Sequence, residues 1–447
     1  MPVRVAVVAE RPQRAARRCP AVENAQVLLD WRTARANATV DIGRLPSWDQ
    51  LPEAARDLLG VAVAVYLADI AVRRGDREQW PRDISLSIPV HLPDLWTSCV
   101  EDLTQLLFAL TRDNFRLDFY AAPELAEPSP GLPFPEGARP DCVSMLSGGI
   151  DSLAGAVAVQ QSGRRPIYSL HQSGNPAVRV AQERSLQAIE SHWPGRSAAC
   201  PYSVAPNPRG ADCLPFPPAE QREPSRRARS LLFMAAAAVT AQGAGVGEAY
   251  MCENGLLTAG LPLSPSRAGS MSTHSTHPAA LELFNGLAAR AGVTAHVSNP
   301  FVYQTKADLI RDVLKPHLSP QEIQSTVSCW AVGRANRQCG GCVPCLLRRI
   351  GMAYAELPEQ AYMIDLLGRP EQYVGTDAYG NLVDLLRHAQ RIAEQSEAEI
   401  VASQPAMLAL EAAGVDIGET IRMLRRHADQ TLSVVRQHYP RAAALIQ

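Results

Sequence analysis

Apolar and polar positions across residues 143–297 follow two alternating patterns. Short continuous apolar runs are typical of buried strands, and the longer stretches between them are typical of helices. Regular alternation of the two predicts an α/β fold, with a doubly wound parallel sheet covered by helices on both faces. In such a sheet, ligands bind at the carboxyl ends of the strands, near the switch in strand order. The expected strands are 143–146, 166–170, 200–204, 248–252 and 293–297, and the expected helices are 151–161, 177–192, 226–242 and 279–290.

The regions on either side of this pattern differ from it. A chain of 447 residues is long enough for two or more domains. Residues 1–123 mix strand-like and helix-like runs and predict an added N-terminal α+β domain, whereas 124–140 are rich in Pro, Gly and Glu and predict a linker. Residues 358–447 predict a helical C-terminal extension. The elements expected before the linker are strands Val3 to Val8 and Ile84 to Val90 and helices Ala54 to Arg73 and Leu95 to Ala109.

The segment between the first predicted strand and helix of the central region is rich in serine and glycine. The two glycines allow a tight turn whose N–H groups face an anion. Serine hydroxyls, the unpaired N–H groups of the helix start and the helix dipole also favour negative charge there. The segment therefore predicts a pyrophosphate cradle, although it lacks the Gly-Lys-Ser/Thr ending of a Walker loop. Taken alone, it could equally be an ordinary turn before a helix. Its sequence is Ser147-Gly148-Gly149-Ile150-Asp151-Ser152.

Four of the ten cysteines lie close together in the sequence. Cys329, Cys339, Cys342 and Cys345 have the spacing C-x9-C-x2-C-x2-C. Four thiolates at this spacing can surround one Zn²⁺ tetrahedrally, and a site filled by four protein ligands has no open position for a substrate. We therefore expect a structural zinc site. Disulfides are disfavoured because the sequence shows no secretory signal and its composition predicts a cytoplasmic enzyme.

Lysine is rare in this chain, which contains only Lys306 and Lys315 among many arginines. The ammonium group of lysine is a compact charge that the planar guanidinium of arginine cannot imitate at a tight phosphate site. Lys306 is therefore a candidate phosphate contact. The alternative is a solvated lysine at a helix start. Ser147, His171, Glu253 and Lys306 fall at or just after predicted strand ends, so they could converge, although His171 could equally end its strand without contacting a ligand.

These features, in this order, resemble the QueC family of PP-loop ATP pyrophosphatases. The resemblance covers about 141–357, roughly half of the chain. It implies an adenine nucleotide alpha hydrolase-like (PP-loop) fold with a zinc-binding segment of four cysteines. Ser230 stands where the family has asparagine. The matching segments are LSGGIDS (146–152), Arg229-Ser230-Leu231-Leu232-Phe233, TKAD (305–308), SCW (328–330) and CGGCVPCLLR (339–348), which includes Arg348.

The resemblance also implies a chemistry that uses ATP and Mg²⁺. The carboxylate of 7-carboxy-7-deazaguanine attacks the α-phosphorus of ATP, and pyrophosphate leaves into the glycine loop. An amine then displaces AMP; in the family that amine is ammonia, and a second ATP-driven step yields the nitrile 7-cyano-7-deazaguanine. Asp151 and Lys306 are the implied catalytic residues, with Mg²⁺ beside Asp151. The implied nucleotide-binding residues are Ser147, Gly148, Gly149, Asp151, Ser152, Arg229 and Lys306.

The added regions resemble the QueC-like proteins of bacterial antiphage operons, especially the QatC type. The polar loop Ser270–Pro278 and the segment Glu253-Asn254-Gly255 are similar to that branch as well. In that branch the resemblance implies transfer of the deazaguanine, through an amide bond, to the N-terminal amine of a partner protein from the same operon. The added regions could hold this partner. Glu253, Asn254 and His277 are then candidate substrate-binding residues.

Charge narrows the range of partners. The net charge is −2, with both signs spread along the chain. This distribution argues against a nucleic-acid partner, and no apolar run predicts a membrane span. The basic cluster Arg226-Arg227-Arg229 could contact ATP phosphates or only flank a loop. Three hypotheses remain: a nucleobase–protein ligase, an ammonia-using nitrile synthase, and a non-catalytic nucleotide-binding subunit of a defence complex. The added regions weigh against the second, and the intact loop and Lys306 weigh against the third.

Overall fold

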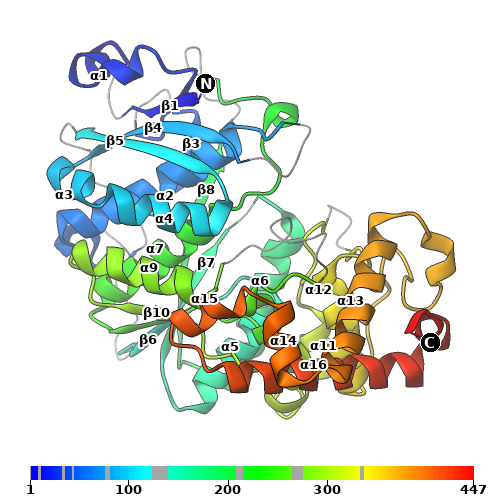
Figure 1. Cartoon of the computed structure of the whole chain (residues 1–447). Coiled ribbons are helices and arrows are strands. Elements are labelled where there is room, and N and C mark those ends of the chain that lie inside the picture. Colours follow the sequence, from blue (N-terminus) through cyan, green and yellow to red (C-terminus); the bar gives the residue numbers. More distant parts are fainter. Residues whose placement is uncertain are drawn as a thin grey trace.

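The computed structural model describes most of the chain in two stacked sheet layers and a group of C-terminal helices (Figure 1). Residues 124–138 of the expected linker (124–140) and residues 270–274 of the polar loop lie outside the described residues. The described residues are 2–8, 12–32, 36–42, 45–75, 81–122, 139–172, 174–207, 215–263, 275–332 and 337–446.

A six-stranded sheet of order β10-β9-β6-β7-β8-β3 forms the centre of the molecule. Val143 pairs in parallel with Ile167 on one side and with Ala249 on the other. The chain runs from β6 to β7 and β8, and then returns to the other side of β6 for β9 and β10, so the switch in strand order lies at β6. The predicted parallel sheet is therefore confirmed. The five parallel strands are β6 (Cys142–Met145), β7 (Pro166–His171), β8 (Ala198–Pro206), β9 (Glu248–Tyr250) and β10 (His296–Ser298).

Two element boundaries lie three residues from their predicted positions, and the others in this layer lie closer. The strand expected to begin at 293 begins at His296, because the N–H of Val293 closes the C-terminal turn of the preceding helix on Ala288 O at 2.9 Å. The helix expected to begin at 226 begins at Arg229, because Arg226 has a left-handed φ of 49°. The helices of this layer are α5 (Ile150–Gln161), α6 (Pro176–His192), α7 (Arg229–Ala244) and α9 (Pro278–Arg290).

The N-terminal region forms a second sheet of order β2-β1-β4-β5, in which all neighbouring strands are parallel. Helices connect these strands, as parallel pairing requires. The region is therefore α/β rather than the expected α+β. The helix expected over 95–109 is divided at Cys99. The elements are β1 (Val3–Val7), α1 (Pro12–Arg18), β2 (Val27–Leu29), α2 (Glu53–Ala71), β4 (Asp83–Val90), α3 (Pro93–Ser98), α4 (Val100–Thr111) and β5 (Asn114–Ala121).

One strand of the N-terminal region belongs to the central sheet. β3 (Ala38–Asp41) pairs antiparallel with β8, with Val40 opposite Val204. In addition, α2 packs against α7, and buried residues of both layers form one hydrophobic cluster. The two layers therefore share a core.

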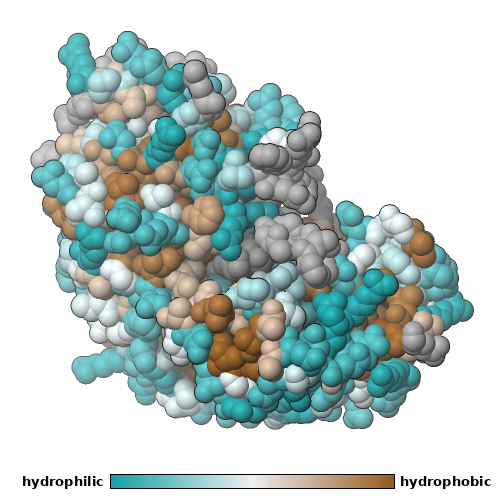
Figure 2. Space-filling view, in the orientation of Figure 1, coloured by the Kyte–Doolittle hydropathy of each residue, from teal (hydrophilic) through white to brown (hydrophobic). Residues whose placement is uncertain are grey.

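The C-terminal extension is helical, as predicted. Its helices and α12 enclose a second hydrophobic cluster that includes Leu346, Leu385 and Leu424. Hydrophobic residues also gather on the surface over α15, where Leu408 is 61% exposed (Figure 2). None of the helices in the described part of the chain has both the length and the apolar composition needed to cross a bilayer. The remaining helices are α8 (Gly255–Ala259), α10 (Lys306–Asp308), α11 (Pro320–Gln324), α12 (Val343–Tyr354), α13 (Asp377–Glu394), α14 (Glu397–Ser403), α15 (Met407–Ala412), α16 (Ile417–His438) and α17 (Pro440–Ala443).

Candidate functional site

The glycine loop joins β6 to α5 at the switch point of the central sheet. Gly148 has a φ of 81°, and a Cβ there would lie 3.0 Å from the backbone N of Gln182, so only glycine fits. Gly149 is the N-cap of α5 and supplies no capping side chain. The first-turn N–H groups of α5 are therefore left for water or a ligand, and the helix dipole favours an anion there.

The two serines of the loop have different environments. Ser152 is buried; its Oγ donates to Gly149 O at 2.9 Å and accepts from Ser147 N at 3.2 Å. Ser147 is exposed, and its Oγ lies 3.1 Å from Ser152 Oγ. Ser152 therefore holds the shape of the loop, and Ser147 is the serine whose hydroxyl is open to solvent.

Asp151 and Lys306 meet beside the loop. Lys306 Nζ lies 2.6 Å from Asp151 Oδ2, and Asn254 Nδ2 donates to the same oxygen at 3.0 Å. Lys306 is 4% exposed, so this ammonium is almost completely removed from water. The other carboxylate oxygen, Asp151 Oδ1, is buried and has no hydrogen-bond partner within the described residues. A carboxylate oxygen of this kind fits a hard cation such as Mg²⁺.

Glu253 follows β9 and faces the same end of the sheet. Its Oε2 accepts from Thr276 Oγ1 at 2.8 Å, and the side chain of Asn299 holds its backbone at 3.2 and 2.8 Å. Burial raises the pKa of Glu253 to about 7, and the negative charge of Asp151 also raises it. A carboxyl group with such a pKa can hold or release a proton near neutral pH.

Of three other predicted site residues, Asn254 contacts this centre. Asn254 is fully buried, caps α8 by accepting from Leu257 N at 3.4 Å, and binds Asp151. His277 accepts from Ala279 N at 3.3 Å, and burial lowers its pKa to about 4. Arg229 is exposed, with its guanidinium 5.5 Å from the centre of the Phe233 ring. Within the described residues, Asp151 is bound by Lys306 and Asn254, and by neither His277 nor Arg229.

The N-terminal region reaches the ligand-binding edge of the central sheet through Tyr66 of α2. The His171 ring at the end of β7 lies 6.0 Å from that of Tyr66, 5.3 Å from that of Tyr202 and 5.4 Å from that of Phe233. Burial lowers the pKa of His171 to about 3, and the charge of Arg229 lowers it further. No sequence signal identified Tyr66, because it lies in a helix that is apolar on nearly every side.

The four predicted cysteine ligands come together. Their sulfurs lie within 4.8 Å of one another, and all four are free thiols. Cys339 Sγ and Cys345 Sγ are 3.8 Å apart, which matches the edge of a tetrahedron built from Zn–S bonds of about 2.3 Å. Cys339 Sγ also accepts from Gly341 N at 3.4 Å and from Cys342 N at 3.3 Å. The cluster is therefore compatible with zinc.

The cysteine cluster is connected to the glycine loop through Arg348 of α12. Arg348 is fully buried; its Nη1 donates to Thr326 O at 2.8 Å, and its Nε donates to Glu359 Oε2 at 2.8 Å. The residue after Thr326 is Val327, whose N–H donates to Gly148 O at 2.8 Å. Arg348 belongs to the segment that resembles the family, and it supports the backbone that contacts the loop.

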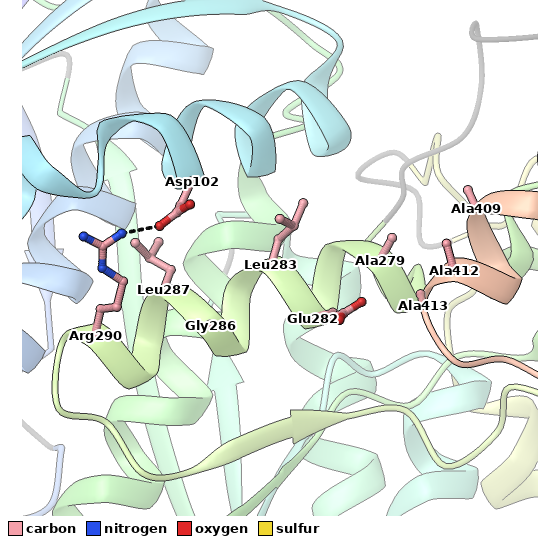
Figure 3. A pocket seen from close by; sticks show the side chains of 10 residues that line it. All are labelled: Asp102, Ala279, Glu282, Leu283, Gly286, Leu287, Arg290, Ala409, Ala412 and Ala413. Atoms are coloured by element: carbon pink, nitrogen blue, oxygen red, sulfur yellow. Dashed lines mark hydrogen bonds and ion pairs between the residues drawn. The ribbon is translucent and has the colours of Figure 1, made fainter.

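A surface groove of about 620 Å³ lies apart from these groups, between α9 and α15 (Figure 3). Leu283 and Leu287 line it on α9 and Ala409 and Ala412 on α15, with an Asp102–Arg290 ion pair at one end. None of its lining residues belongs to the loop or to the Lys306 segment.

Parts of the chain are similar to known proteins. Residues 227–356 match the family model described as queuosine biosynthesis protein QueC. A 7-cyano-7-deazaguanine synthase of Thermoplasma acidophilum is 29% identical over 229 residues, which cover 48% of this chain and 89% of that protein. A synthase of the same name from Xanthomonas euvesicatoria pv. vesicatoria is 26% identical over 238 residues, which cover 49% of this chain and 96% of that protein. Another, from Myxococcus xanthus, is 28% identical over 233 residues, which cover 48% of this chain and 94% of that protein. About half of the chain lies outside the similarity to each of the three synthases.

Proposed function

From the premise that the chain is QueC-like, and so an ATP-dependent enzyme related to deazaguanine chemistry, we propose that it adenylates 7-carboxy-7-deazaguanine and transfers the deazaguanine to an amine. The observation that carries this proposal is the buried Lys306–Asp151 pair, at 2.6 Å, beside an uncapped glycine loop at the switch point. Cation, carboxylate and free N–H groups together suit a bound triphosphate.

The first step makes the substrate carboxylate reactive. A carboxylate oxygen bonds to the α-phosphorus of ATP, and the bond from that phosphorus to the bridging oxygen of pyrophosphate breaks. The N–H groups of the loop and of the α5 start receive the departing pyrophosphate. Lys306 offsets the negative charge that develops on the phosphates. Asp151 Oδ1 is the free oxygen that would hold Mg²⁺.

Glu253 is the best candidate for recognising the base. An ionised carboxylate can accept hydrogen bonds from the adjacent N–H groups of a guanine-like ring. Glu253 is fixed at its backbone by Asn299 and sits close enough to Asp151 for their charges to interact. Both polar atoms of the Asn254 side chain are engaged within the chain, so Asn254 supports Asp151.

We further propose that the amine is the N terminus of a partner protein and that the chain serves in antiphage defence. The N-terminal region supports this choice, because it lies outside residues 227–356, which match the family model, and contributes Tyr66 at the ligand-binding edge. The alternatives are ammonia as the amine, with 7-cyano-7-deazaguanine as the product, and a non-catalytic nucleotide-binding subunit. The cysteine cluster would hold zinc as a structural ion in all three cases.

Intact-mass analysis of the chain co-expressed with its operon neighbours distinguishes these functions. A deazaguanine mass added at the N terminus of a neighbour supports the ligase. Conversion of 7-carboxy-7-deazaguanine and ammonia to the nitrile, with no mass added to any neighbour, supports the synthase. ATP binding without pyrophosphate release in either assay supports the non-catalytic subunit and excludes the proposal.

A further inference from the structure

The turn that carries Lys306 is held in shape by a reciprocal pair of hydrogen bonds. Thr305 Oγ1 accepts from Asp308 N at 3.0 Å, and Asp308 Oδ2 accepts from Thr305 N at 3.1 Å. This capping box begins α10 (Lys306–Asp308), which continues directly into a π-helical segment, Leu309–Leu314. Helices shorter than about 12 residues are only marginally stable by their own hydrogen bonds, so the position of this segment depends on what packs around it.

Gln430 of α16 binds both members of this capping box. Its Oε1 accepts from Thr305 Oγ1 at 2.7 Å, and its Nε2 donates to Asp308 Oδ1 at 2.6 Å. Gln430 is 4% exposed and Thr305 is fully buried. These bonds are therefore made away from water, where an unmade hydrogen bond is costly.

Two further residues join α16 to the same segment. Arg426 Nη2 donates to Tyr303 O at 2.5 Å, and its Nε lies 3.4 Å from Asp308 Oδ2. The backbone N of Asp416, the N-cap of α16, donates to Tyr303 Oη at 2.9 Å. The first turn of α16 and its middle therefore both contact the residues around Lys306.

We propose that α16 positions Lys306 for phosphate contact through Gln430, which makes the C-terminal extension a working part of the adenylation site. The inference rests on the proposed function for the role of Lys306. Gln430 is a positioning residue: it contacts Thr305 and Asp308, which set the place from which Lys306 reaches Asp151. Glutamine suits this place because its amide donates to a carboxylate and accepts from a hydroxyl at the same time.

The first test measures the position of Lys306 without any substrate. Because Lys306 and Lys315 are the only lysines of the chain, their acylation by an amine-reactive reagent can be followed by peptide mass spectrometry. Gln430→Met keeps the length of the side chain and removes both hydrogen bonds. We expect Lys306 to react about tenfold to thirtyfold faster in this variant, whereas exposed Lys315 should react as in the parent.

Thr431→Val is the matched control. Thr431 is the next residue of α16, is fully buried, and has a hydroxyl with no hydrogen-bond partner among the described residues. Its replacement changes the same turn of the helix without touching the capping box. Lys306 should react in this variant as it does in the parent.

The second test measures pyrophosphate release from ATP and 7-carboxy-7-deazaguanine. A displacement of about 1 Å can cost about a hundredfold in rate, so kcat should fall by roughly ten- to a hundredfold in Gln430→Met, with a smaller change in KM for ATP. Gln430→Glu should recover activity as the pH falls, because a protonated carboxyl can donate to Asp308 and an ionised one repels it. Arg311, Arg426 and His427 also face Asp308 and are present in both variants.

The outcomes separate this inference from the proposed function. Unchanged acylation of Lys306 in folded Gln430→Met overturns the inference, whatever the activity. Faster acylation with no pyrophosphate release by the parent supports the positioning contact and overturns the proposed function. If Gln430→Met does not fold, the acylation of Gln430→Glu is measured as a function of pH. The rate at Lys306, divided by the rate at Lys315, should fall as the pH falls. A ratio that stays constant overturns the inference.

Discussion

Replacing Lys306 with arginine tests the site most directly, because it changes the shape of the cation and keeps its charge. Lys306 Nζ lies 2.6 Å from Asp151 Oδ2, and the side chain is 5% exposed. The turn that carries Lys306 cannot easily move to make room for a larger side chain, because α10 packs closely on α12. A methyl group on Gly351 of α12 would lie 3.4 Å from the backbone of Ala307. Overpacking of this kind typically costs about 1–3 kcal/mol of unfolding free energy.

The effect on adenylation should be larger than the effect on stability. A guanidinium forms two parallel hydrogen bonds with a carboxylate, so it would occupy Asp151 Oδ1, the oxygen left without a partner in the described chain. The variant would then lose the compact ammonium and the proposed Mg²⁺ ligand together. Loss of one electrostatic contact to the transition state typically costs about 10²–10³ in rate, which corresponds to about 2.7–4 kcal/mol. We expect Lys306→Arg to fall within this range.

The assay is pyrophosphate release at saturating ATP and 7-carboxy-7-deazaguanine, with thermal unfolding measured on the same samples. Lys315→Arg is the matched control, because Lys315 is exposed and its Nζ donates to Ala355 O at 2.7 Å, a contact that arginine can also make. If Lys306→Arg and Lys315→Arg both behave like the parent, Lys306 does not contact the phosphates and its assignment to the site is wrong.

Three more perturbations test other parts of the site. Asp151→Ala should abolish conversion of ATP to AMP while leaving a folded chain, because it removes the partner of Lys306 and the free oxygen at the loop; near-normal pyrophosphate release would exclude the PP-loop assignment. The parent should carry about one zinc per chain by elemental analysis, and Cys342→Ser should lose the metal and unfold at a lower temperature; a metal-free parent, or disulfides among the four cysteines, would contradict this. Because burial raises the pKa of Glu253 from 4.5 to about 7, the folded parent binds an extra proton between these values and its unfolding free energy falls as the pH rises through them. The unfolding free energy of Glu253→Gln should therefore rise relative to that of the parent between pH 4.5 and about 7, and the difference between the two should be constant at higher pH. If this difference does not vary with pH, burial does not raise the pKa of Glu253.

Local sequence patterns predicted the parts of the fold that depend on neighbouring residues. The apolar runs identified β6, β7 and the helices between the strands, because burial on both faces requires continuous apolar sequence. The cysteine cluster was also predictable, since its four residues are close in sequence and two of the turns bring sulfurs together. The expected convergence at the strand ends is seen for Lys306, which pairs with Asp151 of the loop.

Contacts between distant segments carried no such signal. Gln430 resembles any other polar residue in an amphipathic helix, and its partners are Thr305 and Asp308, more than a hundred positions away. Tyr66 contacts His171 from a helix in the other sheet layer. The N-terminal region was expected to be α+β because its strands and helices were visible but their parallel pairing was not. In each case the sequence does not specify which surfaces of the folded chain pack together, because the spacing of residues along the chain carries no information on contacts between distant segments.

The pairing of β3 with β8 has a consequence for attempts to shorten the protein. β8 would be an edge of the central sheet if β3 did not cover it, and Val40 and Val204 would then lose their partners. A fragment that begins near residue 141, where the sequence resemblance to the QueC family begins, would expose that edge together with the α7 surface that α2 covers. Unpaired edge strands beside apolar surface are templates for aggregation. The synthase-like half is therefore not a portable module, and a soluble minimal enzyme should retain the N-terminal region at least from Ala38 to α2.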